Sequence, residues 1–400
     1  MPVRAFTASL VALLVTVGLA VPWAHEITCE SHSKRVLKST IVFASNRDNL
    51  TLPFIEAAEI YVMDLGFDMD GKPTLGPPRR LTNNLDRDTL PALSPDGKGT
   101  IVFDSNRVRK TASPPEPTSS DLFLIKNGQL PMFLTRGSSA TWSPNGKRIA
   151  FHRSASDTFV PPEGNPSPGA PTDDSDIFVL KVHRGTDGPK NLTFEEPDDR
   201  LYINEDADWS PDGKRIAFAR RSVLDNNFPA NSGDIWVMNA DGKDKIQLTG
   251  LSTQAKFEDK GPAWSPDGRF IAYSCRYGPL LTDRPEICVT DLKDVKHPWD
   301  SIPAPTRLTN TAEGELGTHW IPSRYGNGNK ILYQRPLVQM QGQQIWLMDL
   351  EKFDSAGFPV TMQLTGLTSA EGTNQFPNWG VIKTKCGDDD DDDDEEDERH

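Results

Sequence analysis

Acidic residues recur just ahead of one repeated segment of this sequence, which contains a Trp or Leu followed by a turn. Carboxylates that converge in this way could hold a hard cation, because Ca²⁺ and similar divalent cations prefer oxygen ligands. Such residues also cap turns and face water, so the alternative of no cofactor stays open. The candidates are Asp86, Asp88, Asp206, Asp208, Glu258, Asp259, Glu313, Glu315 and Glu371, and Arg200 and His319 occupy similar places.

Other catalytic motifs are incomplete. The sequence contains no Gly-x-Ser-x-Gly nucleophile elbow, and His25–Cys29 (HEITC) has Cys29 where a zincin motif requires its second His. The segment Asp68–Gly71 (DMDG) lacks the rest of a calcium loop and is predicted to be a turn. We therefore predict no catalytic residue, and whether the protein is an enzyme stays open, with a non-enzyme favoured.

The candidates are positioned by a repeat whose clearest copy is ADWSPDGKRIAFARR at 207–221. It predicts a short strand, a Ser-Pro-Asp-Gly turn and a second strand rich in Ile and Phe. Each copy is followed by an alternating aromatic and aliphatic strand and then by a short strand ending in Leu-Thr. Further copies of the first part lie at 91–103, 140–151, 262–273 and, degraded, 318–333.

A four-stranded unit repeated every ~40 to 60 residues predicts a β-propeller, in which each blade packs only on its neighbours. First strands at Leu93, Trp142, Trp209, Trp264, Trp320 and Trp379 predict six blades of four antiparallel strands. A lone first strand near Trp379 and three strands near residues 40–47, 59–65 and 79–82 predict a closing blade shared between the two termini. The fold class is therefore all-β.

The pieces WSPDGKxIAF, DIWVMNADG and Leu-Thr resemble the WD40-like (PD40) repeats of TolB-type propellers over residues 39–385. Propellers of this kind serve as binding scaffolds, as gating domains of serine peptidases and as the whole of some polysaccharide lyases. The resemblance to TolB implies protein–protein interaction.

The remaining segments predict an extracytoplasmic protein. Residues 1–24 resemble a cleaved signal peptide, residues 25–38 are expected to be a leader, and 386–400 an acidic disordered tail. We expect no membrane span and a monomer that is secreted or periplasmic. The net charge of −14 is largely due to residues 388–400, so the propeller lacks the basic surface that nucleic acid requires.

Four cysteines in an oxidising compartment predict disulfides. Antiparallel strands would place Cys275 opposite Cys288, and ring closure would bring Cys29 close to Cys386. Four reduced thiols are the alternative.

Strand parity predicts that the second-to-third and fourth-to-first connections share one face, here called the long-connection face. These connections include 108–120, 155–174 and 195–206. Long loops on a rigid scaffold commonly carry binding residues. Two hypotheses follow: a non-catalytic propeller that binds a protein or glycan there, and a carbohydrate-active enzyme resembling the propeller lyases of uronate oligomers, with a divalent metal at the channel mouth.

Overall fold

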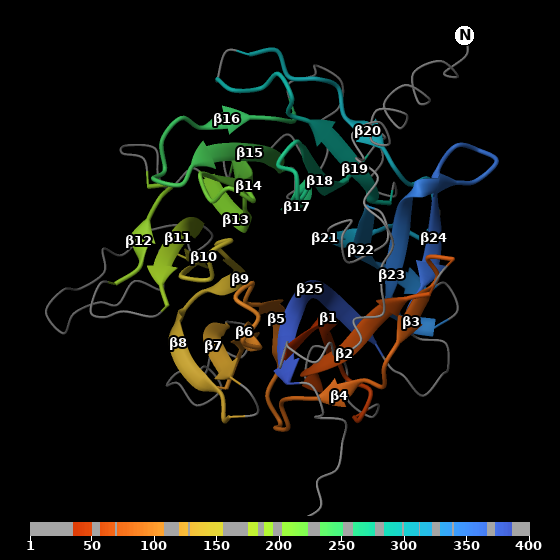
Figure 1. The fold of residues 1–400 in the computed structure, drawn as a ribbon. Helices are drawn as coiled ribbons and strands as arrows, with labels where there is room; N and C mark the ends of the chain where they lie inside the picture. Colours follow the sequence, from red (N-terminus) through yellow and green to blue (C-terminus); the bar gives the residue numbers. More distant parts are fainter. Residues whose placement is uncertain are drawn as a thin grey trace, which may run out of the picture.

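The computed structural model describes most of the propeller region: residues 35–49, 57–68, 70–107, 120–126, 129–154, 175–182, 188–194, 202–222, 233–250, 259–276, 284–297, 300–311, 313–321, 329–337, 340–365 and 373–385. Every element with assigned bounds is a β-strand, and the strands form a propeller-like arrangement around a common centre (Figure 1). The prediction of an all-β propeller is confirmed at this level.

Three sheets have four strands each. They are β5 (Asp88–Leu93), β6 (Thr100–Ser105), β7 (Asp121–Lys126) and β8 (Met132–Arg136); β17 (Lys260–Trp264), β18 (Phe270–Cys275), β19 (Glu286–Asp291) and β20 (Thr306–Arg307); and β21 (Leu316–Ile321), β22 (Lys330–Leu337), β23 (Met340–Phe353) and β24 (Pro359–Gln363). A five-stranded sheet contains β1 (Arg35–Ser45), β2 (Glu59–Phe67), β3 (Pro73–Leu75), β4 (Arg79–Arg80) and β25 (Asn374–Lys385).

The remaining eight strands pair into one sheet. They are β9 (Ser138–Trp142), β10 (Arg148–Ser154), β11 (Ser175–Lys181), β12 (Lys190–Asn191), β13 (Tyr202–Trp209), β14 (Arg215–Ser222), β15 (Asp234–Asn239) and β16 (Ile246–Gln247). The described strands thus form four separate blade-sized sheets and one larger sheet, where the sequence predicted six separate blades. The difference arises because β11 and β13 pair in parallel at Ser175 and Ile203, which joins two meanders.

Strands from distant parts of the sequence close the ring. β1 pairs antiparallel with β25, from Arg35 opposite Lys385 to Ser45 opposite Asn374, with one bulge. The prediction that one sheet takes strands from both ends of the propeller region is confirmed. β1 begins at Arg35, inside the range 25–38 that we expected to be a leader.

Six strands lie innermost. β5, β9, β13, β17, β21 and β25 contact one another in a closed cycle, each touching the next (Figure 1). Each has a bulge or register shift beside a residue of positive φ: Leu90 (48°), Ser139 (56°), Asp206 (55°), Gly261 (59°), Gly317 (63°) and Phe376 (53°). A bulge bends a strand and re-aims its side chains, so this repeated bend fixes what the inner strands present to the centre.

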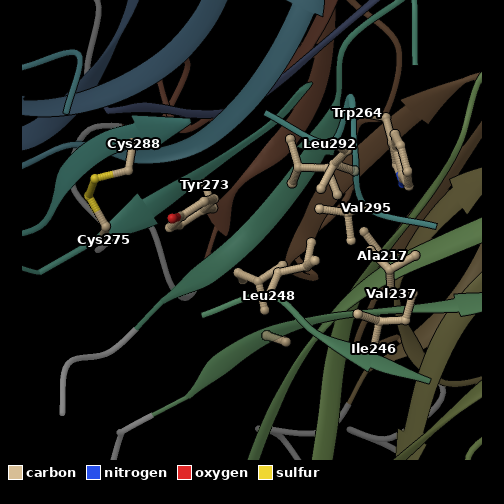
Figure 2. Packing of buried hydrophobic residues seen from close by; sticks show 13 residues of the cluster. Ala217, Val237, Ile246, Leu248, Trp264, Tyr273, Cys275, Cys288, Leu292 and Val295 are labelled. Carbon is tan, nitrogen blue, oxygen red and sulfur yellow. A yellow bond between two sulfur atoms is a disulfide. The ribbon is translucent and has the colours of Figure 1, made fainter. Parts of the chain in front are cut away.

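Hydrophobic clusters hold consecutive sheets together. In one of them, Ala217 and Val237 from the β13–β16 part of the large sheet pack against Trp264 and Tyr273 of the next sheet (Figure 2). The repeat Trp also bonds across such an interface, because Trp142 Nε1 donates to the Ala92 carbonyl at 2.9 Å. This packing explains why each repeat supplies Ile, aromatic and Trp residues at fixed places.

The turn predictions are also confirmed. In the Ser-Pro-Asp-Gly turn after β13, Ser210 Oγ donates to Asp212, and Gly213 has a φ of 68°. In Asp68–Gly71, the Gly71 N–H donates to the Asp68 carbonyl, and Asp68 Oδ1 accepts the Lys72 N–H.

Candidate binding site at the inner strands

Most predicted site residues lie in or beside the inner strands. Asp86 and Asp88 lie at β5, Asp206 and Asp208 in β13, Asp259 before β17, and Glu313, Glu315 and His319 at β21. Arg200, Glu258 and Glu371 lie outside the described residues. Five of the described candidates fall into two sets of equivalent positions along the inner strands: Asp88, Asp259 and Glu315 in the first, and Asp208 and His319 in the second. Asp86, Asp206 and Glu313 belong to neither set.

The first set stands five residues before each repeat Trp or Leu93, here called the interface position. Its members are Asp88, Gly137, Asn204, Asp259, Glu315 and Asn374. Asp88 is fully buried, and its carboxylate accepts two hydrogen bonds from Arg107 Nη2 at 2.9 and 3.0 Å. Asn84 donates both to Asp88 and to Glu59 of the preceding sheet. The Asp88 carboxylate therefore links neighbouring sheets.

Two amide side chains form equivalent links at other interfaces. Asn204 Nδ2 donates to Asp176 Oδ1 at 3.3 Å, and Asn374 Nδ2 donates to Gln344 Oε1 at 2.7 Å. Sequence reasoning missed both because it searched for carboxylates. Aligning the repeats on their Trp would have found them, since they stand five residues before Trp209 and Trp379.

The second set stands one residue before the repeat Trp or Leu93, here called the inner ring. Its members are Ala92, Thr141, Asp208, Ala263, His319 and Asn378. Asp208 accepts the Trp264 N–H at 2.8 Å and the Thr141 hydroxyl at 3.2 Å, and so ties three inner strands together. Asn378 Oδ1 accepts the Leu93 N–H at 3.0 Å, which is the same bond made by a neutral side chain.

Burial perturbs both titratable groups of the inner ring. It raises the pKa of Asp208 from 3.8 to about 7, although hydrogen bonds from Trp264, Thr141 and Trp209 act in the opposite direction. It lowers the pKa of His319 from 6.5 to about 4, so this imidazole is neutral at pH 7. Asn378 Nδ2 lies 3.3 Å from His319 Nδ1 and is the donor, because its Oδ1 already accepts from Leu93. The His319 proton therefore resides on Nε2.

A further polar group lies where β6 meets β9, and the sequence analysis did not identify it. Asp104 accepts the Ser138 hydroxyl in a short hydrogen bond and the Ser139 N–H at 3.1 Å. Burial raises the pKa of Asp104 to about 7. The signal was present in the repeat, because Asp104 occupies a place where Ala44 and Ala219 stand in other copies. Ser139 Oγ in turn donates to Asp206 at 3.3 Å.

These contacts define what the inner strands can do chemically. Asp88 and Glu315 are engaged by arginines, and Asp208 by a hydroxyl and a backbone amide. Within the described ranges, no group of three or more His, Cys, Asp and Glu side chains is arranged to hold a metal ion. Asp208 and His319 are only half-buried, so they are the titratable inner-ring groups that solvent or a ligand can reach.

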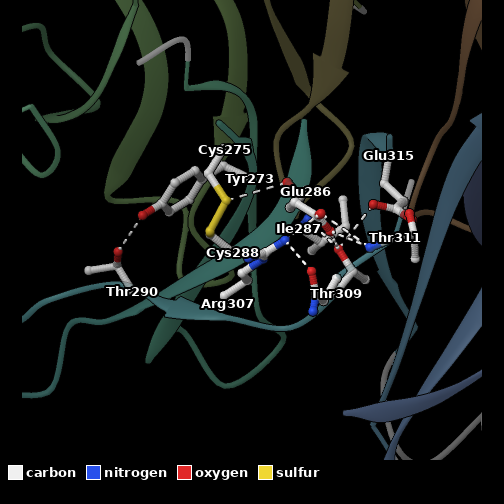
Figure 3. The surroundings of a disulfide bond; sticks show 11 residues. Tyr273, Cys275, Glu286, Ile287, Cys288, Thr290, Arg307, Thr309, Thr311 and Glu315 are labelled. Carbon is white, nitrogen blue, oxygen red and sulfur yellow. Dashed lines mark hydrogen bonds and ion pairs between the residues drawn. A yellow bond between two sulfur atoms is a disulfide. The ribbon is translucent and has the colours of Figure 1, made fainter. Parts of the chain in front are cut away.

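The disulfide between Cys275 and Cys288 is confirmed, with a Cα–Cα distance of 5.8 Å (Figure 3). The predicted register was wrong by two residues: Cys275 pairs with Glu286 and Tyr273 with Cys288, so the cysteines are diagonal neighbours. The predicted pair Cys29 and Cys386 lies outside the described residues. No helix among the described ranges has the length and apolar character needed to cross a bilayer.

No family model and no curated protein sequence matches the chain. Among solved structures, it is similar to a prolyl endopeptidase (15% identity over 82% of this chain and 43% of that one, TM-score 0.44). It is also similar to a puromycin-hydrolysing peptidase of Mycobacterium tuberculosis (16%, 78% and 45%, TM-score 0.45) and to the GH74 enzyme of Niastella koreensis (12%, 81% and 45%, TM-score 0.39). The chain spans less than half of each of these proteins. The propeller arrangement described here rests on the chain's own strand pairing.

Proposed function

We propose that the protein is a six-bladed, TolB-like propeller that binds a protein or glycan partner through its long-connection face, without catalysing a reaction. It acts as a secreted or periplasmic monomer, with a signal peptide at 1–24, a propeller at 39–385 and an acidic tail from 386. The eight-stranded sheet counts as two blades, because a single parallel pair joins its two meanders. The closed cycle of six inner strands supports this count.

The main support for the proposal is that the buried acids between the sheets are already in contact with arginine side chains. Arg107 and Arg335 each lie 2.9 Å from a carboxyl oxygen, of Asp88 and Glu315 respectively, and both acid side chains are fully buried. A cation at either place would have to displace an arginine. These acids therefore build a rigid frame, and a rigid frame is what positions surface loops for recognition.

Replacing one connection tests this proposal. Ser154 and Ser175 are register partners across β10 and β11, so a two-residue Asn-Gly turn can replace residues 155–174 without moving either strand. The intact protein should retain a partner from the native extracytoplasmic fraction or a glycan from an array, and the shortened variant should lose it. A matched control carries Lys147→Glu and Lys214→Glu in exposed turns of the opposite face, and it should bind normally. Equal binding by the shortened variant would refute the proposal.

Asp208 favours a second candidate, the carbohydrate-active enzyme with a divalent metal at the channel mouth. A half-exposed carboxyl group whose pKa is about 7 is suited to general acid–base chemistry near neutral pH. Metal analysis of the purified protein, with assays for cleavage of uronate oligomers, tests this candidate. Turnover that is lost in Asp208→Asn would favour it over the binding scaffold.

A further inference from the structure

Two buried carboxyl groups meet between the β17–β20 sheet and the β21–β24 sheet. Glu286 begins β19 and Glu315 directly precedes β21, and their side chains are 4% and 0% exposed. Each has its own arginine: Arg307 Nη2 lies 2.6 Å from Glu286 Oε1, and Arg335 Nη2 lies 2.9 Å from Glu315 Oε1. Figure 3 shows both acids beside Thr309 and Thr311.

The Thr309 hydroxyl has three polar neighbours but only one proton to donate. Its oxygen accepts the Ile287 N–H at 2.9 Å. It lies 2.6 Å from Glu286 Oε2 and 3.0 Å from Glu315 Oε2. The shorter contact takes the hydroxyl proton. The contact to Glu315 is then a hydrogen bond only if Glu315 supplies the hydrogen.

At two other interfaces, the corresponding polar side chains are hydrogen-bonded to each other without a proton from a carboxyl group. Between Glu59 and Asp88, the amide of Asn84 has two N–H groups and donates to both acids. Between Gln344 and Asn374, both side chains are amides and bond directly. Glu286 and Glu315 are instead bridged by a hydroxyl, which cannot donate to both.

We propose that Glu315 retains a proton on Oε2 at neutral pH and that this proton makes the interface a pH-sensitive joint. The chain of donors runs from Glu315 to Thr309 and from Thr309 to Glu286. When the pH rises and Glu315 ionises, its Oε2 faces a hydroxyl oxygen that has no hydrogen left to donate, and two like charges share a buried site. The contact between the two sheets then weakens.

The net effect of the surrounding groups is to raise the pKa of Glu315. Burial has the largest effect and the charge of Glu286 acts in the same direction, whereas the contacts with Thr311 and Thr309 and the charge of Arg335 lower the pKa. Tyr333 of β22 also interacts with Glu315, and burial raises the pKa of this phenol, so that it stays neutral. Arg307 of β20 contacts Glu286 on the other side of the interface. The disulfide between Cys275 and Cys288 lies beside Glu286 and holds β18 to β19 on the Glu286 side of the interface.

The test compares the wild-type protein with Glu315→Gln, which carries hydrogen without titrating. Because the folded pKa is raised, the wild type binds an extra proton when folded, and its stability falls as pH rises between the unfolded and folded pKa values. The ratio of folding constants, variant over wild type, should therefore rise by up to about tenfold per pH unit between pH 5 and the folded pKa. The infrared carbonyl band of a protonated carboxyl group at pH 7 should lose intensity in the variant.

Parallel pH profiles together with an unchanged infrared band would overturn the proposal. Glu286→Gln is a second variant, in which the Thr309 hydroxyl can donate its proton to Glu315. The infrared carbonyl band should therefore also weaken in this variant, and a band of full intensity would count against the proposal.

Discussion

Replacement of Asp208 by Asn should stabilise the protein at pH 8. The Asn oxygen can accept the Trp264 N–H as Asn378 accepts that of Leu93, so the geometry survives. What changes is the ionisation, since the pKa of Asp208 rises from 3.8 to about 7 on folding. A pKa shift of this size corresponds to a loss of about 4 kcal/mol of folding stability as the pH rises from 3.8 to about 7. Asp208 keeps some solvent contact, so we expect about 2 kcal/mol.

Urea unfolding followed by tryptophan fluorescence at pH 5, 6.5 and 8 measures this effect. Asp208→Asn should exceed the wild type in stability by about 2 kcal/mol at pH 8, with a smaller difference at pH 5. Asn378→Asp is the mirror variant, and it should lose stability progressively as pH rises. A variant Asp208→Asn that is less stable than the wild type at pH 8, or a difference in stability that does not depend on pH, would contradict a raised pKa of Asp208 in the folded protein.

Two further predictions concern buried contacts. Lys330 is fully buried, and its Nζ lies 2.9 Å from Asp349 Oδ2. The variant Asp349→Ala should lower the free energy of unfolding by about 3 to 5 kcal/mol, because it leaves the Lys330 charge buried and unpaired. The double variant Lys330→Met and Asp349→Leu should lose much less stability, because no unpaired charge remains. Chemical denaturation of the three proteins checks this, and equal losses would contradict it. Replacing Cys275 and Cys288 by Ala should lower the free energy of unfolding by about 2 to 3 kcal/mol, since the disulfide closes a loop with a sequence separation of 13 residues. A thermal unfolding transition of the wild type that a reducing agent leaves unchanged would count against this prediction.

The repeat determined how much of the fold could be predicted. Ser-Pro-Asp-Gly turns and alternating strands are local signals, so strand order and ring closure followed from the sequence. The link between β11 and β13 did not, because it depends on one non-local pair, Ser175 and Ile203. The register of Cys275 likewise depends on where β18 and β19 begin to pair, and the sequence alone placed it two residues away.

The site was harder to predict than the fold. The sequence identified Asp88 and Glu315 as acids near the centre, but the function of a carboxylate depends on its partner. Those partners were not singled out: Arg107 lies two residues after the end of β6, and Arg335 lies in β22. Asp104 was missed for a different reason: it interrupts a hydrophobic strand and is bonded to Ser138 and Ser139, 34 and 35 residues away.

The decisive experiment measures partner binding by the protein in which Asn-Gly replaces residues 155–174, alongside the intact protein and the Lys147→Glu and Lys214→Glu control. The intact protein and the control should retain the same protein or glycan partner, and the shortened protein, folded to the same thermal stability, should not. Retention of the partner by the shortened protein, or its loss in the control, would contradict the assignment of binding to the long-connection face.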